Sequence, residues 1–563
     1  MKRIDTDVLV IGGGGAGLMA AHEAAKHPVR VAVVNKGRIQ RTGATVMAPG
    51  AIGAVDDRWK RPEDSKALHL ADTIRGGGCV NDYGLARTVV EQSAETVLEL
   101  ERMGALFQRE EDGKQYMLRI DGGHSYPRCP FLEDRVGKEM MKAMVSGLRQ
   151  QRVELYEDIL MLKVLTENGQ VTGAVGVSTV DLEPYVFSCG AVILATGGAG
   201  TLYANTDNPT GLTGDGYALA LECGAQLRDM EFVQFFPVGF LNPPTLRGIL
   251  AGLMYYIHLL NAKGERFMEK YDPERLELST RDRVARAIVQ EVREGRGTPS
   301  GGVYMDMTYQ EPGFIAKMSP ALYSTYQSIG KDPEKDYIEV APTVHFFMGG
   351  ISVDGNWEAG VKGLFGAGET CGGMHGANRL SQNALAELLV SGKVAGEQAA
   401  KQARKGHRAI DLAAALEPVE SLRAMLGSRE GISPFLLREK LRKLMTEKVG
   451  VIRDKASLEE ALAEVEALSH AAVAIRESSP YMNREIIEAA ENRHLLLTAR
   501  AIILSALERQ ESRGAHYRSD YPETDNGGYF CNFFVEQKDG RFITGRKEAS
   551  GENRDYWGGE GHG

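Results

Sequence analysis

Residues 7–34 read DVLVIGGGGAGLMAAHEAAKHPVRVAVV, and this stretch decides the fold. An apolar run, a run of glycines, an alanine-rich stretch and a second apolar run predict a strand, a turn, a helix and a strand. Gly12, Gly14 and Gly17 fit the pattern G-x-G-x-x-G. Its glycines allow a tight turn, a close approach of backbone to a pyrophosphate, and close packing of helix on strand. The free N–H groups at the helix start favour phosphate there. The stretch therefore predicts a dinucleotide-binding βαβ unit.

Further glycine turns follow later in the chain. Asn35 and Lys36 stand at the end of the second predicted strand, where such sites often carry an acidic residue, so the first turn alone does not choose between NAD and FAD. ATGGAG (195–200), TGDG (213–216) and GAGE (366–369) do bear on the choice. This set resembles an FAD enzyme, in which a late strand returns a glycine turn and an acid to the ribityl chain.

Composition limits the possible functions. Lys and Arg number 66 against 76 Asp and Glu, a net charge of −10, so nucleic-acid binding is not expected. Six scattered cysteines without a C-x-x-C pair argue against a metal site, an intrinsic iron–sulfur cluster and disulfides, and favour a reducing cytoplasm. No signal peptide is recognisable, and the longest apolar stretch, 249–262, is too short for a bilayer of about 30 Å. We therefore expect a cytoplasmic protein that reaches a membrane only through a partner.

Motifs spread over nearly the whole chain resemble one enzyme family. It is the flavoprotein subunit of succinate dehydrogenase and fumarate reductase, together with its relative L-aspartate oxidase. HGANRL and ESRGAH are particular to that group. The motifs are GGGGAG (12–17), ATGGAG (195–200), TGDG (213–216), NAKGERFME (261–269), TRD (280–282), PTVHFFMGGI (342–351), GLFGAGE (363–369), HGANRL (375–380) and ESRGAHYRSDYP (511–522).

The fold class that follows is α/β. We expect a Rossmann-like FAD-binding domain with an inserted α+β capping domain, then a helical domain and a C-terminal tail. The pattern predicts one strand over 185–195, a capping box at Ser457 to Glu460, and a mobile last dozen residues. The predicted divisions are 1–238 (FAD-binding domain, first part), 239–342 (capping domain), 343–408 (FAD-binding domain, second part), 409–510 (helical domain) and 511–563 (tail).

The resemblance also implies which residues contact FAD. They lie in the glycine turns, in the segment after the second strand, and around HGANRL. The set is Gly12, Gly14, Gly15, Ala16, Gly17, Asn35, Lys36, Thr42, Gly43, Ala44, Gly50, Ala195, Thr196, Gly197, Asp215, Glu369, Arg379, Ser381 and Asn383.

Three residues match the family's substrate site. In the family, the flavin passes a hydride to one alkene carbon, an arginine gives a proton to the other, and polar side chains clamp the carboxylates. Arg281 in TRD matches the proton donor, although it could instead form a surface ion pair with Asp282. His345 in PTVHFF matches a carboxylate-binding histidine, and Arg379 in HGANRL matches the carboxylate-clamping arginine, whose planar fork suits that partner.

Other positions depart from the family. Its Gln-Phe-His-Pro-x-Gly motif appears here with Phe236 in place of the histidine, and Ile249 and Leu250 stand where a Thr-Glu pair is expected. Leu253 takes the place of the arginine that relays protons. One end of the pocket has thus become apolar, and burying an unpaired carboxylate there would cost several kcal/mol. The alternative is that Phe236 only packs and Arg247 supplies the second clamp.

We therefore expect reduction of an α,β-unsaturated carboxylate, or dehydrogenation of the saturated acid, on a substrate other than plain fumarate or succinate. Gly43 stands at the position of the family's flavin-linking histidine, so FAD should be bound non-covalently. With no cluster ligands in the chain, a separate iron–sulfur subunit should carry the electrons. The alternatives are a fumarate reductase or succinate dehydrogenase proper, an L-aspartate oxidase-like flavin oxidase, and an electron-transfer subunit without its own substrate.

Overall fold

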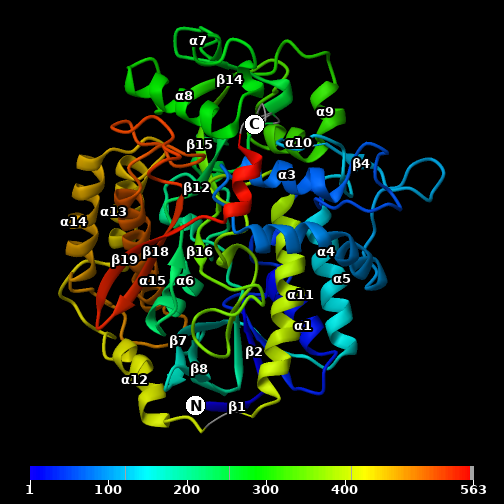
Figure 1. Ribbon diagram of the computed structural model, residues 1–563. Coiled ribbons are helices and arrows are strands. Elements are labelled where there is room, and N and C mark those ends of the chain that lie inside the picture. The colour runs from blue at the N-terminus through cyan, green and yellow to red at the C-terminus, as the bar shows by residue number, and fades with distance from the viewer. Residues whose placement is uncertain (121, 253, 407–408, 558–563) are drawn as a thin grey trace.

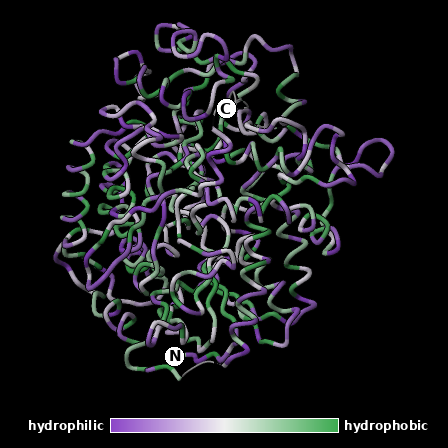
Figure 2. The backbone as a smooth tube through the Cα atoms, in the orientation of Figure 1, coloured by the Kyte–Doolittle hydropathy of each residue, from purple (hydrophilic) through white to green (hydrophobic). Residues whose placement is uncertain are grey.

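The computed structural model describes residues 1–120, 122–252, 254–406 and 409–557. A five-stranded parallel sheet with the order β17-β10-β2-β3-β6 forms its centre. Figure 2 shows the apolar character of this interior, where every residue of β2, β3 and β10 is buried. The strands are β2 (Val8–Ile11), β3 (Val31–Val34), β6 (Glu154–Tyr156), β10 (Ala191–Leu194) and β17 (Leu364–Gly366).

Helices cover one side of this sheet (Figure 1). The first of them begins immediately after the glycine turn, as predicted, and packs along the last helix of the FAD-binding domain. The helices of this part of the chain are α1 (Gly15–Ala24), α2 (Ala44–Met47), α3 (Lys66–Gly76), α4 (Tyr83–Arg102), α5 (Val136–Gln150) and α11 (Asn383–Ala403), with the short pair β4 (Leu118–Arg119) and β5 (Cys129–Pro130). Helix α6 (Asp215–Glu222) packs instead against α15 (Arg484–Glu508).

A second sheet, with the order β1-β9-β8-β7, corrects one prediction. The stretch 185–195 is not one strand: β9 pairs with β1 and β8 in this sheet, whereas β10 pairs with β2 in the central sheet. The polar break at Ser188 to Gly190 lets the chain leave one sheet for the other. The strands are β1 (Lys2–Asp5), β7 (Ile159–Glu167), β8 (Gln170–Ser178) and β9 (Pro184–Ser188).

The capping domain lies at the top of Figure 1 and has its own hydrophobic cluster. Its sheet has the order β12-β15-β14-β13, and the predicted limits 238/239 and 342/343 fall inside β12 and β15, which carry the chain in and out. Its elements are β12 (Val233–Phe240), β13 (His258–Leu260), α7 (Met268–Tyr271), α8 (Arg281–Arg293), β14 (Val303–Asp306), α9 (Phe314–Met318), α10 (Pro320–Ser328) and β15 (Ile338–Phe347).

The helical domain follows, with one correction at a helix start. Asp454, not Ser457, is the N-cap of α14, and its carboxylate accepts the Ser457 N–H. An ionised Asp is a strong N-cap, so the helix begins three residues before the predicted capping box. The helices are α12 (Leu412–Arg423), α13 (Pro434–Lys448), α14 (Lys455–Ser469) and α15 (Arg484–Glu508).

The C-terminal tail is more ordered than predicted. It forms the hairpin β18 (Cys531–Lys538) and β19 (Arg541–Glu548), which joins β11 (Leu227–Arg228) and β16 (Gly350–Ile351) in one sheet. Of the last dozen residues, those up to Trp557 are described, and Gly551–Tyr556 form a short helix. There, buried Asn553 donates hydrogen bonds to the carbonyls of Cys79 and Asn81. These buried bonds hold the segment in place.

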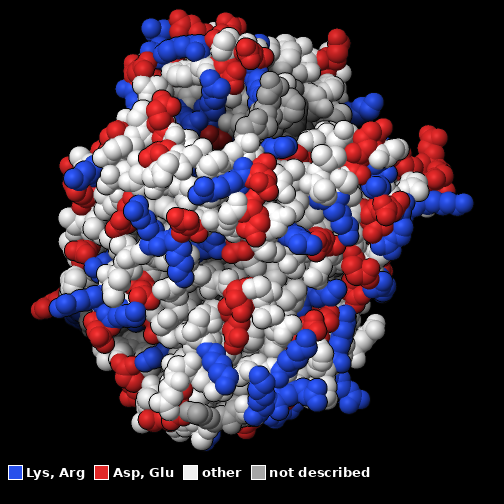
Figure 3. All heavy atoms as spheres, in the orientation of Figure 1, with Lys and Arg blue, Asp and Glu red and all other residues white. Residues whose placement is uncertain are grey.

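Three general features bear on function. All six cysteines are free thiols. In the described ranges no helix is long and apolar enough to cross a membrane, and no group of three or more His, Cys, Asp or Glu could hold a metal ion. On the face shown in Figure 3, charges of both signs are interspersed.

Candidate active site

The glycine turn after β2 brings two distant segments into contact. Gly12 has φ +117°, and a Cβ there would lie 2.2 Å from the Ala195 carbonyl oxygen, so only glycine fits. The turns 12–17 and 195–200 therefore meet at the carboxyl ends of β2 and β10, where open α/β sheets bind ligands. At the start of α1, Asn35 accepts the Gly13 N–H at 2.9 Å and Thr45 accepts the Gly15 N–H at 3.1 Å.

The segment after β3 closes against the later part of the chain. Thr42 accepts an Asn35 amide hydrogen bond, and Gly43 is the N-cap of α2, with φ +94° and no neighbour within 4 Å of a would-be Cβ. A side chain at position 43 would be strained, which agrees with a glycine there. Gly50 lies against Gln382, whose side chain accepts the Ala51 N–H at 2.6 Å.

Lys36 and Asp215 form an ion pair, at 2.9 Å, whereas the sequence indicated them only as separate contacts. Glu491 and His494 of α15 complete the cluster, with Lys36 to Glu491 at 2.7 Å and His494 to Asp215 at 2.9 Å. Burial alone would raise the Asp215 pKa, but Lys36 and His494 outweigh it and the pKa is lowered. The helical domain thus supports the cofactor cradle, which no local sequence signal indicated.

Glu369 is a buried carboxyl group with spare acceptor capacity. It accepts the Phe347 N–H at 3.1 Å, and burial raises its pKa to about 8. Near it, Thr370 accepts the Gly197 N–H and Thr196 accepts the Gly216 N–H. The close-packed glycine turns, and a carboxyl group with capacity left to accept hydrogen bonds from hydroxyl groups, fit a dinucleotide with a polyol chain, as FAD has.

Arg379 combines burial with an unused donor. It is 7% exposed, its Nη2 donates to Gln234 at 2.9 Å and its Nη1 donates to the Leu380 carbonyl, whereas its Nε has no partner. Burial, and then the charge of Arg281, lower its pKa to about 9, so it stays a cation at neutral pH. An orphaned guanidinium donor in a buried position suits an anionic ligand.

His345 and Phe236 are diagonal neighbours on adjacent strands. Phe236 of β12 lies opposite Thr343 of β15, so His345, two residues on, shares its face, and the two ring centroids are 5.9 Å apart. Asp207 binds the His345 Nδ1 at 2.6 Å, which leaves Nε2 as the nitrogen available to a ligand. Asp207 was missed because 138 residues separate it from His345.

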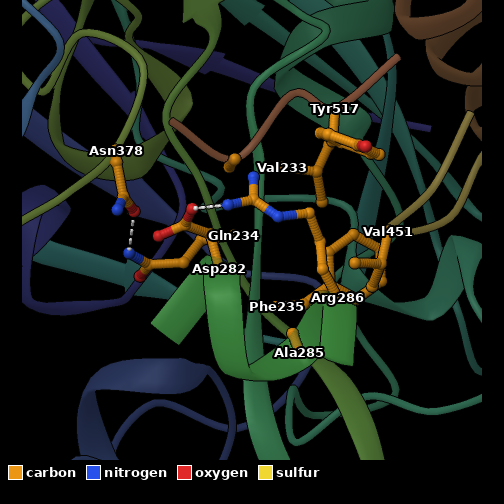
Figure 4. A pocket seen from close by; sticks show the side chains of 10 residues that line it. Val233, Gln234, Phe235, Asp282, Ala285, Arg286, Asn378, Val451 and Tyr517 are labelled. Atoms are coloured by element: carbon orange, nitrogen blue, oxygen red, sulfur yellow. Dashed lines mark hydrogen bonds and ion pairs between the residues drawn. The ribbon is translucent and has the colours of Figure 1, made fainter. Parts of the chain in front are cut away.

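Arg281 is the first residue of α8, and its guanidinium lies over the ring of Phe236. Its Nη2 donates to the Ser381 hydroxyl at 2.6 Å, and its Cζ lies 5.1 Å from the Phe236 ring centroid. Asp282 pairs instead with Arg286 at 3.1 Å, as Figure 4 shows, so the alternative of an Arg281–Asp282 surface pair finds no support. Figure 4 also shows Gln234, the support of Arg379, bonded to Asn378.

The other residues predicted for the apolar end of the pocket make fewer contacts with Phe236, Arg281 and His345. Leu250 is half-buried and packs against the hydrophobic cluster of Phe236, but Ile249 is 39% exposed. Arg247 is exposed too, so it gives no support to a second clamp. Leu253, expected in place of the proton-relaying arginine, lies outside the described residues.

Ser381 and Asn383, both predicted FAD contacts, have protein partners. Asn383 binds Thr73 and His69, and Ser381 binds Arg281 through its hydroxyl. Their FAD contacts, like all the other predicted FAD contacts, stay predictions. The residues that the structure does bring together come from β12, β15, α8 and the loop before α11: Phe236, His345, Arg281 and Arg379.

The chain is similar to known proteins over almost all of its length. Residues 7–385 match the family described as FAD binding domain, and residues 438–547 match the family described as fumarate reductase flavoprotein C-term. One relative, from Methanothermobacter marburgensis, belongs to the fumarate reductase (CoM/CoB) of that organism. It is 41% identical, over 92% of this chain and 95% of that protein.

Two solved structures share the fold. Sdh1 of Mycobacterium smegmatis in complex with UQ1 is 36% identical with a TM-score of 0.90, covering 98% of this chain and 95% of that one. The E. coli quinol fumarate reductase is 30% identical with a TM-score of 0.91, covering 98% and 97%.

Proposed function

Because this chain belongs to the family of fumarate reductase and succinate dehydrogenase flavoprotein subunits, we propose that it reduces the C=C bond of an α,β-unsaturated monocarboxylate with an apolar far end, or runs the reverse reaction. The family makes it an FAD-dependent oxidoreductase acting on CH–CH groups. The substrate, the non-covalent state of the FAD and the redox partner belong to the proposal.

The observation that carries the proposal is the position of Phe236. Its ring centroid lies 5.1 Å from the Arg281 Cζ and 5.9 Å from the His345 ring centroid, so it neighbours two of the three polar substrate-binding candidates. A phenyl ring offers no hydrogen-bond donor to a carboxylate, and desolvating an unpaired carboxylate against it costs several kcal/mol. An alkyl or aryl group gains from the same contact, at about 25 cal/mol per Å² buried.

The protein's own groups divide the remaining work. Arg379 and His345 bind the carboxylate, Arg379 through its unused Nε and His345 through Nε2. This polarises the conjugated double bond. Arg281 holds a proton on its guanidinium at the other alkene carbon. Bound FAD supplies the hydride.

An iron–sulfur protein is the proposed electron donor, as a separate subunit. In its support, the M. marburgensis relative is itself named as one subunit of an enzyme, and in the described ranges no cluster-type ligand set occurs. An oxidase would need only O₂. Slow reoxidation of the reduced flavin in air, without stoichiometric H₂O₂, would support the partnered enzyme.

Fumarate reduction is the second candidate, and the 41% identity to a protein named fumarate reductase favours it. The deciding experiment is an anaerobic assay with reduced viologen as donor and fumarate, crotonate and cinnamate as acceptors. We expect at least one of the two monocarboxylates to exceed fumarate in kcat/KM by about tenfold or more. Fumarate turning over as fast as both would overturn the apolar-end proposal and leave fumarate reduction.

A further inference from the structure

A fully buried ionic network lies behind the active site. Arg128 is 0% exposed and binds Asp64 through two nitrogens, at 2.8 and 3.1 Å. Its Nη1 also binds Asp72 at 2.7 Å. Two carboxylates therefore hold Arg128 in one orientation, so the residues that it contacts have a fixed neighbour.

The next contact is His124, whose ring is 7% exposed. Its Nε2 lies 2.6 Å from the Ser381 carbonyl oxygen, and its Nδ1 lies 3.3 Å from Arg128 Nη1. A carbonyl only accepts and a guanidinium only donates, so His124 is a neutral imidazole with its proton on Nε2. Burial, and then the charge of Arg128, lower its pKa to about 4, in agreement with this assignment.

Ser381 connects His124 to Arg281. Its carbonyl accepts from His124, its N–H donates to the Gly122 carbonyl at 3.2 Å, and its hydroxyl accepts from Arg281 at 2.6 Å. The backbone of Ser381 is thus held on both sides, and its hydroxyl is hydrogen-bonded to the Arg281 guanidinium. This matters because an arginine side chain has about 2 kcal/mol of rotamer entropy to lose when it is fixed.

We propose that His124 and Ser381 are positioning residues for proton transfer, which aim the Arg281 guanidinium at the substrate through the chain Arg128–His124–Ser381–Arg281. The inference rests on the proposed role of Arg281 as proton donor. If the Arg281 guanidinium is displaced, Arg379 and His345 can still bind the carboxylate. The loss should therefore appear in kcat, not in substrate binding. Errors of about 1 Å in such an arrangement cost roughly 100-fold in rate.

The test compares His124→Ala with His124→Gln, and Ser381→Ala with Ser381→Thr, in the holoenzyme. Glutamine keeps an amide N–H for the Ser381 carbonyl, and threonine keeps the hydroxyl. His22→Ala, at a nearly buried histidine on α1 that binds Glu99, controls for the loss of any histidine. The substrate is whichever acid of the panel the wild type reduces fastest, fumarate included.

We expect both alanine variants to lower kcat about 10- to 100-fold with KM changed less than about threefold. His124→Gln and His22→Ala should stay within about threefold of wild type, and Ser381→Thr should lose less kcat than Ser381→Ala. Crystal structures give a second measurement that needs no substrate: the Arg281–Ser381 bond should be lost or split in His124→Ala and kept in His124→Gln.

Three results would overturn the inference. The first is that the alanine variants keep more than half of the wild-type kcat. The second is that they lose substrate affinity and melting temperature to the same extent as His22→Ala. The third is an unmoved Arg281 in the His124→Ala crystal. If the wild type reduces no acid of the panel, the proposed function fails, and the crystal comparison still decides the positioning role.

Discussion

Arg281 and Phe236 face each other in the candidate active site, with the guanidinium carbon 5.1 Å from the ring centroid. An arginine over an aromatic face is attracted to its negative quadrupole, by about 0.5–1 kcal/mol or more when desolvated. Because Phe236 stands in place of the family's histidine, the pocket has one hydrogen-bond donor fewer. At the same time, its ring helps to hold the proposed proton donor. The capping domain supplies both residues, from β12 and α8.

Phe236→His should shift substrate choice toward dicarboxylates. The imidazole would give a second carboxylate a donor, so the ratio of kcat/KM for fumarate over crotonate should rise about 10- to 100-fold. The measurement is the anaerobic viologen assay with both acids. Phe236→Leu is the matched control, because it keeps the apolar surface and should keep the wild-type ratio. A ratio unchanged in Phe236→His would mean that this ring does not touch the substrate.

Arg281→Lys should lower kcat by about 100-fold or more, since a positioned general acid contributes about 10²–10⁴. Lysine keeps the charge but cannot reproduce the planar contacts to Ser381 and Phe236. Stopped-flow reoxidation of the reduced enzyme by substrate measures the step. Arg283→Lys, at an exposed residue of the same helix, should behave as wild type. Full activity in Arg281→Lys would leave the proton donor elsewhere.

Arg379→Lys should weaken carboxylate binding for every acid in the panel. A charge-assisted hydrogen bond is worth about 1.5–3 kcal/mol, so the dissociation constant should rise roughly 10- to 100-fold. Titration of the oxidised enzyme with the saturated acid, followed by the flavin absorption spectrum, measures it. Arg404→Lys, just beyond α11, is the control. Unchanged affinity in Arg379→Lys would assign the carboxylate to other residues.

Glu369→Gln should change how the apo-protein responds to pH. Burial raises the Glu369 pKa from 4.5 to about 8, so the folded state binds this proton more tightly than the unfolded state. Stability from this group is therefore full below about pH 4.5 and falls as pH rises toward 8, by roughly 4 kcal/mol. The melting temperature of Glu369→Gln relative to wild type should rise between pH 5 and 8. A constant difference would show that Glu369 is ionised throughout.

The flavin should leave the protein on acid precipitation. Gly43 has no side chain to form a link, and its φ of +94° disfavours any replacement. After trichloroacetic acid treatment, we expect all FAD absorbance in the supernatant and none in the pellet. A pellet that still fluoresces as flavin would reveal a covalent bond through another residue.

Local patterns predicted the elements that depend on local physics. The βαβ opening follows from hydrophobic period and glycine chemistry, which neighbouring residues express. The errors came at junctions. Periodicity could not show that 185–195 divides between two sheets, because both halves are buried and apolar.

The sequence by itself determined the family and FAD as its cofactor, and it singled out Phe236, Arg281, His345 and Arg379, because the motifs that carry them are contiguous. Only the tertiary structure decided how they meet. It placed Phe236 beside both Arg281 and His345, bonded the Ser381 hydroxyl to Arg281 and the Ser381 carbonyl to His124, and left Ile249 exposed. The physical reason is that these contacts join residues 45 to 257 positions apart, and chain folding, not local periodicity, sets such distances.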